Sequence, residues 1–191
     1  MAVYDLSDPS VPLPTQIVVD TSLLLALRPA DDNPWTSAAR AFVRRMEERI
    51  ADLALVAWLP LSVVQECYHV ILANGLRKAW EAMDPVGRPP NWLSAYKKRP
   101  ELLKRCLPEL ARFRGLLAAI PLTPVRPEDL AASTAAEPLE ARMRHFISRY
   151  HLLPQDALIL AEAERLGVAA VATVDREWRR ATAFDVYTCG D

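Results

Sequence analysis

The sequence is poor in residues that mark several common protein classes. It has five glycines, and none lies in a GxGxxG or P-loop pattern, which argues against those modes of nucleotide binding. The three cysteines, Cys67, Cys106 and Cys189, are widely spaced and form no CxxC pair. Scattered cysteines in odd number predict neither a disulfide framework nor a zinc site, and they favour a reducing, cytoplasmic compartment.

Long apolar runs and a strong charge of one sign are also lacking. No apolar stretch approaches the roughly 20 residues that a membrane span needs, and no signal peptide is indicated. We therefore expect no contact with a membrane. The net charge of −1 gives no global signal for nucleic acid, although a local basic patch stays open.

Apolar segments alternate with amphipathic ones along the chain, which predicts an α/β protein. We expect a three-layer α/β/α sandwich around a mainly parallel sheet of about five strands. The expected strands are residues 16–20, 55–59, 115–122, 168–175 and 183–189.

Among the segments between these strands, three predict helices that bear on the candidate site. In the helix expected over 60–75, Ser62 and Gln65 fit a capping box and Gly75 supplies a stop. The other two are expected over 138–152 and 153–167. We interpret residues 1–15 as an extended N-terminal arm and 16–191 as a single domain, with a basic helical insertion at about 76–114.

Four carboxylates stand among apolar neighbours, where a charge is costly to bury. They end two of the strands or lie near the start of a helix, and they are Asp20, Glu66, Asp156 and Asp175. Strand ends and the starts of the following helices share one edge of a parallel sheet, so these acids could converge. Converged carboxylates repel unless a hard cation such as Mg²⁺ or Mn²⁺ joins them. Such a site can activate water against a phosphate.

Each of these acids also has a purely structural interpretation. Asp20 and Asp156 suit the N-terminal turn of a helix, where a carboxylate caps free N–H groups or favours the positive end of the helix. Glu66 suits the solvated side of its helix, and Asp175 suits a turn. Taken together, however, four acids at matching positions in successive β–α units favour a shared site.

At these residues the chain resembles a known family, the PIN-domain ribonucleases, which include the VapC-type toxins of toxin–antitoxin pairs. Four segments carry the resemblance, in the family's order and spacing, from about Ile17 to the C-terminus. They read "VVDTSLLLAL", "VVQECYHV", "LLPQDALILAEAERLG" and "VATVDREW".

The resemblance implies an endoribonuclease that uses Mg²⁺ or Mn²⁺. Asp20, Glu66, Asp156 and Asp175 would be its catalytic and metal-binding acids, with Ser22 and Thr173 as supporting polar residues. It also implies a homodimer and, for a toxin, inhibition by a cognate antitoxin protein. The alternative is a PIN-fold module that binds RNA or a protein without cutting.

Residues 76–114 hold ten Lys and Arg against four Asp and Glu, with Trp80, Trp92 and Tyr96 among them. Cations contact phosphates and aromatic rings stack on unpaired bases, so Lys97 and Lys98 are candidates for RNA binding. The alternative is a solvated helix pair whose tryptophans pack inward. Three further candidates follow the fourth acid, namely Arg176, Arg179 and Arg180.

Overall fold

The computed structural model of the protein describes residues 1–28, 33–83, 91–131 and 137–190. The chain divides into two units, and each is described by itself. The first consists of Met1–Val64 and Ile120–Asp191, and the second consists of Gln65–Ala119.

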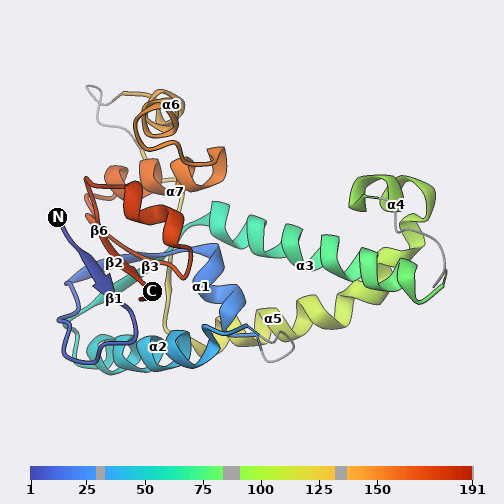
Figure 1. Cartoon of the computed structure of the whole chain (residues 1–191), viewed down its shortest axis with the longest axis horizontal. Helices are drawn as coiled ribbons and strands as arrows, with labels where there is room; N and C mark the ends of the chain where they lie inside the picture. The colour runs from blue at the N-terminus through green and yellow to red at the C-terminus, as the bar shows by residue number, and fades with distance from the viewer. Residues whose placement is uncertain (29–32, 84–90, 132–136, 191) are drawn as a thin grey trace. The chain divides into compact units, whose positions relative to one another are not determined.

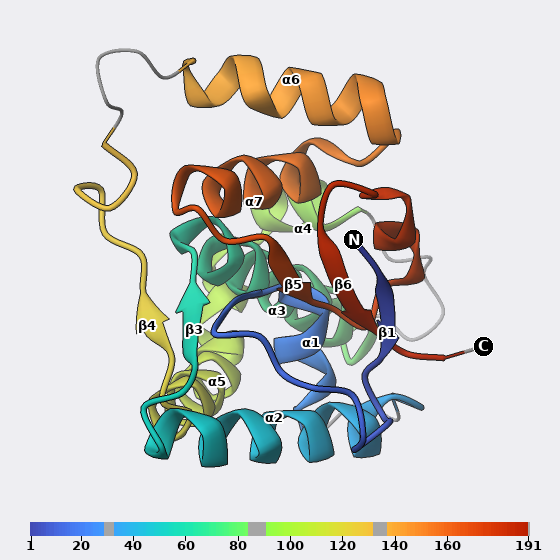
Figure 2. The same ribbon diagram turned by 90° about the vertical axis from the view of Figure 1, so that its left-hand side faces the viewer.

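The first unit is built on one parallel sheet of six strands, which confirms the expected fold class (Figure 2). Two strands that are far apart in the sequence, β2 and β5, lie side by side in the middle, with Val18 opposite Val171. The strands, in their order across the sheet, are β1 (Val3–Asp5), β6 (Asp185–Thr188), β5 (Ala170–Ala172), β2 (Gln16–Val19), β3 (Val56–Leu59) and β4 (Thr123–Pro124).

Helices cover both faces of this sheet and complete three layers. In both views α7 (Pro154–Arg165) lies between the sheet and α6 (Leu139–Tyr150), while α2 (Thr36–Ala51) lies on the opposite side (Figures 1 and 2). A short helix, α1 (Thr21–Ala26), follows β2 directly. The central strands are buried on both faces, which explains why their sequences are continuous apolar runs rather than alternating ones.

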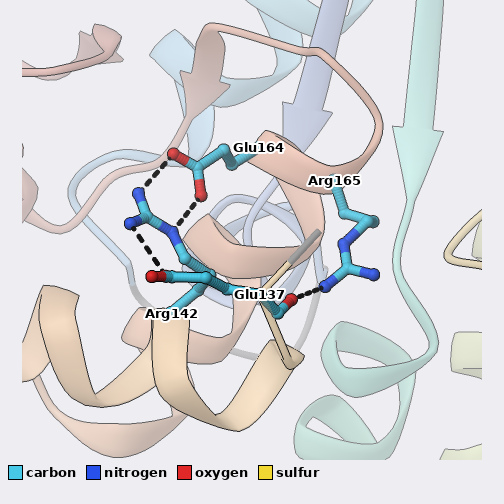
Figure 3. Close-up of polar contacts among 4 residues, drawn as sticks. All are labelled: Glu137, Arg142, Glu164 and Arg165. Carbon is cyan, nitrogen blue, oxygen red and sulfur yellow. Dashed lines mark hydrogen bonds and ion pairs between the residues drawn. The ribbon is translucent and has the colours of Figure 1, made fainter. Parts of the chain in front are cut away.

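Helices α6 and α7 are joined by a charged clamp (Figure 3). Arg142 on α6 donates two hydrogen bonds to the carboxylate of Glu164 on α7, at 2.6 and 2.5 Å. Arg165 donates to the backbone carbonyl of Glu137, just before α6. Two parallel hydrogen bonds from a guanidinium to a carboxylate fix direction as well as distance, so the clamp orients α7.

The N-terminal segment adds a strand to the edge of the sheet. Val3 lies opposite Val186 in β1, and the Tyr4 ring stacks on Tyr187 with 4.8 Å between centroids. Farther along, the Tyr187 hydroxyl donates to the carbonyl of Pro12 at 2.9 Å. The sheet has six strands, where about five were expected, partly because β1 pairs with β6. This pairing joins residues more than 180 positions apart.

The prediction of a strand over residues 115–122 was wrong. Most of that stretch belongs to helix α5 (Leu107–Ala119), and the strand at this place, β4, begins only at Thr123. A short apolar run fits a buried strand and one side of a helix equally well, so periodicity does not distinguish the two.

All the regular secondary structure among the described residues of the second unit is helical. It contains most of α3 (Leu61–Glu81), then α4 (Trp92–Lys98), the 3₁₀ helix η1 (Pro100–Cys106) and α5. Part of the predicted basic insertion, residues 84–90, lies outside the described residues.

Both end signals predicted for α3 were wrong. Ser62 lies inside the helix and its hydroxyl donates to Glu162 instead of capping, and the helix continues past Gly75 to Glu81. Gly75 serves packing: a Cβ built there would lie 2.7 Å from the Sγ of Cys106. A bare backbone at this position lets η1 approach α3 within the second unit.

Substituting Gly75 by alanine tests this close approach. We expect Gly75→Ala to lower the free energy of unfolding by about 1–3 kcal/mol, since the new methyl overpacks the contact with Cys106. The matched control is Gly115→Ala in α5, where a Cβ meets nothing within 4 Å, so the variant should gain about 0.5–1 kcal/mol from helix propensity. Urea unfolding measures both. Equal effects of the two substitutions would contradict the close approach.

Candidate functional site

The site is built around the carboxylate of Asp20 at the end of β2. The residue is 2 % exposed, and its backbone N–H donates to the carbonyl of Ala172 at 2.9 Å, which continues the ladder between β2 and β5. Its Oδ2 accepts hydrogen bonds from the hydroxyls of Ser22 at 2.6 Å and Thr173 at 2.8 Å. The two hydroxyls lie 2.9 Å apart. Three side chains, from the end of β2, the start of α1 and the end of β5, therefore form one polar cluster.

The cluster lies at the point where the order of the strands reverses. From β2 the chain moves outward to β3 and β4, then returns to the other side of β2 through β5 and β6. In open parallel sheets, ligands bind outside the carboxyl ends of the strands at such a point. Asp20 and Thr173 follow directly after β2 and β5, so they occupy the expected ligand position.

Asp20 is also a helix cap, which confirms its structural interpretation, while its role as a metal ligand stays a prediction. It is the N-cap of α1, and its Oδ2 accepts from the backbone N–H of Ser22 at 3.1 Å. Burial raises the pKa of the Asp20 carboxyl, and the hydrogen bonds from Ser22 and Thr173 partly oppose this shift. All these donors are neutral, so a cation bound beside Asp20 would favour its charged form.

Asp175 lies two residues beyond Thr173 and begins the 3₁₀ helix η2 (Arg176–Arg180). Its backbone N–H donates to the Thr173 hydroxyl at 3.0 Å, and its Oδ1 accepts from the backbone N–H of Glu177 at 2.9 Å. Trp178, the last residue of the "VATVDREW" segment, is fully buried. This tryptophan anchors η2 in the core, which holds Asp175 at the same sheet edge as Asp20.

Asp156 lies in the first turn of α7 and is half-buried. The neighbouring Gln155 donates from its side-chain amide to the carbonyl of Ser62 at 2.9 Å. The start of α7 is therefore tied to the start of α3, which follows directly after β3. Asp156 thus belongs to the edge at which the strands end.

Glu66 belongs to the second unit, where it is half-buried on α3. The other three acids, Asp20, Asp156 and Asp175, belong to the first unit. Its membership in the carboxylate cluster stays a prediction.

Among the residues that the structure describes, no three Asp, Glu, His or Cys side chains lie close enough together to hold a metal ion. The residues nevertheless fit a hard cation, because the donors around Asp20 are carboxylate and hydroxyl oxygens. Mg²⁺ is usually held by one or two carboxylates and keeps several waters, so a full cage is not required. The four acids as metal ligands stay a prediction.

The three arginines proposed for RNA binding make contacts inside the protein. Arg176 donates to the Gly190 carbonyl and lies over the Trp35 ring, 4.9 Å from its centroid. Arg179 donates to the Cys189 carbonyl at 2.9 Å, and Arg180 pairs with Glu177. These contacts give all three a structural role in holding η2 and the C-terminal segment, and their RNA role stays a prediction.

The chain was compared with protein-family models and with curated proteins. A family model, that of the PIN domain, matches residues 17–183 of the chain. A search of curated proteins gives no significant match. Separately, in the described part of the chain no helix is both long and apolar enough to cross a membrane.

Sequence reasoning missed one buried acid, Glu162 on α7. It is 5 % exposed, and its carboxylate accepts a hydrogen bond from the Ser62 hydroxyl on α3. Burial raises the pKa of Glu162, with the Ser62 hydrogen bond acting in the opposite direction. The only signal in the sequence is its position between Ala161 and Ala163 on the apolar side of α7.

The raised pKa of Glu162 predicts a pH-dependent stability. Ionised Glu162 is disfavoured in the folded protein, so its contribution to stability falls as pH rises from the unfolded pKa through the raised folded pKa. Glu162→Gln keeps an acceptor for Ser62 without the charge. We expect this variant to unfold at higher denaturant than the unchanged protein at neutral pH, and the two to converge below about pH 4. A constant difference across urea titrations at several pH values would contradict this account.

Proposed function

The chain belongs to the PIN domain family, whose fold is of the nuclease type, and we propose that it is a metal-dependent endoribonuclease that hydrolyses RNA phosphodiester bonds. One observation carries the proposal. Asp20 is a buried carboxylate held by the Ser22 and Thr173 hydroxyls at the ligand position of a parallel sheet. A merely capping aspartate would not require a second hydroxyl from the neighbouring strand end.

The residues present divide the work of hydrolysis between them. Asp20 would hold the ion, with Asp156, Asp175 and Glu66 as further carboxylates. When bound, Mg²⁺ or Mn²⁺ supplies an activated water and offsets the charge that builds on the phosphate. Ser22 and Thr173 fix the direction of the Asp20 carboxylate, as supporting shells around metal sites do.

The choice of RNA as substrate, like Mg²⁺ or Mn²⁺ as the ion, is supported by the resemblance to PIN-domain ribonucleases in four segments of the sequence. The same resemblance suggests a homodimer and a toxin that pairs with an antitoxin. The second candidate is a PIN-fold module that binds RNA or a protein without cutting.

Cleavage of a mixed RNA pool by the purified protein distinguishes these candidates. We expect cutting with Mg²⁺ or Mn²⁺ and none with EDTA. Asp20→Asn should reduce the rate by about a hundredfold or more, because a bound metal contributes several kcal/mol to the transition state. The matched control is Asp52→Asn, an exposed residue just after α2, which should cut at the unchanged rate.

Two outcomes would contradict the proposal. Equal cutting by Asp20→Asn would show that the activity comes from another site or from a contaminating nuclease. No cutting of the pool with either metal, by protein that circular dichroism shows to be folded, would favour the non-catalytic module.

A further inference from the structure

The second unit contains a pocket that the proposed catalytic site does not use. It is a cavity of about 210 Å³ between α3, α4 and η1. Six residues line it, namely His69, Leu72, Leu76, Trp92, Tyr96 and Leu103. The lining is thus aliphatic on α3 and η1 and aromatic on α4, with one imidazole.

The aromatic side of the pocket is solvent-exposed. Trp92 and Tyr96 lie four residues apart on α4, so they share one side of that helix, and they are 39 % and 40 % exposed. The His69 ring meets Trp92 edge-on, with 4.6 Å between centroids. Trp92 is therefore held in place by a neighbouring ring while much of its surface stays open to solvent.

The floor of the pocket is a fixed part of the fold. Leu76 belongs to a buried cluster with Ala79, Leu102 and Cys106, and Leu72, Leu103 and Trp80 pack against this cluster. Trp80 thus packs inward, as one of the two interpretations of the basic segment expected. Trp92 and Tyr96 are not needed to build that core and remain available to a ligand.

Cations follow the pocket residues of α4 and η1 in the sequence. Lys97 and Lys98 directly follow Tyr96, and Lys104 and Arg105 directly follow Leu103. All four are exposed, and the described residues offer none of them a salt bridge. Other cations of this unit do pair with a carboxylate, for example Arg77 with Glu81 and Arg99 with Glu101.

We propose that this pocket binds an unpaired base of an RNA strand, while Lys97, Lys98, Lys104 and Arg105 contact the adjoining phosphates. The inference rests on the proposed function for its choice of RNA. Aromatic rings bordered by cations are how proteins hold single-stranded nucleic acid without reading its sequence. Exposed cations that form no salt bridge with the described residues favour a polyanion over an apolar peptide, because an apolar peptide offers them no negative charge.

The pocket also predicts a preference between forms of RNA. A base enters the cavity only when it is unstacked from its neighbours, and bases in a duplex are stacked and paired. Single strands and loops should therefore bind more tightly than a duplex of the same length.

Fluorescence anisotropy of a short labelled oligouridylate tests the inference. The protein is the full chain with Asp20→Asn, in EDTA, so that binding is measured without cutting. We expect Trp92→Ala to weaken binding about tenfold or more, and Trp92→Phe to retain most of the affinity because a ring remains. The matched control is Leu107→Ala, an exposed apolar residue of the same unit outside the pocket, which should bind as before.

The phosphate contacts have their own signature. Replacing Lys97 and Lys98 together by Gln should lower the slope of log affinity against log salt by about 1.4, since each phosphate contact to a single strand contributes about 0.7. Replacing Arg40 and Arg44 on α2 by Gln removes two exposed cations from the first unit and should leave the slope unchanged.

Unchanged affinity of Trp92→Ala, or an equal loss for duplex and single strand, would overturn the base pocket. Full RNA binding by Trp92→Ala, alongside loss of binding to a protein partner, would point to a peptide site instead. The two proposals can fail independently. If cleavage requires Asp20 but Trp92→Ala binds RNA normally, only the proposed base pocket is contradicted. If binding depends on Trp92 but the protein cuts no RNA, only the proposed nuclease activity is contradicted.

Discussion

The buried hydrogen bonds between Asp20, Ser22 and Thr173 determine how the first unit presents its proposed active site. A carboxylate at the end of an interior strand is costly unless donors surround it. The hydroxyls of Ser22, at the start of α1, and of Thr173, at the end of β5, are those donors. The same bonds begin α1 and join β2 to β5 at the reversal of strand order. Folding of the sheet thereby places an oxygen-rich cluster at the position where parallel sheets bind ligands.

The two units use charge in different ways. In the first unit, the arginines near Asp175 bond to backbone carbonyls and a glutamate, so they stabilise the C-terminal segment. In the second unit, Lys97 and Lys98 form no salt bridge with any described residue, and they follow an exposed aromatic residue. According to the two proposals, the residues at the sheet edge catalyse the cleavage and the helical unit binds the RNA strand.

The sequence predicted features that depend on local patterns. Continuous apolar runs located the central strands, and the strand ends located Asp20 and Thr173. It did not predict β1, whose pairing with β6 joins distant residues, or the burial of Glu162, which depends on Ser62 a hundred residues away. The strand expected over 115–122 was wrong because a short apolar run fits either a helix or a strand.

Electron paramagnetic resonance of Mn²⁺ tests the central claim, that Asp20 holds a metal ion, most directly. Free Mn²⁺ gives a sharp signal that diminishes on binding, so titration counts the bound ions without reference to any substrate. We predict that the unchanged protein binds Mn²⁺, that Mg²⁺ competes for the site, and that Asp20→Asn loses this binding while Asp52→Asn keeps it. Equal Mn²⁺ binding by Asp20→Asn, with the fold intact by circular dichroism, would contradict the assignment of Asp20 as the centre of the site.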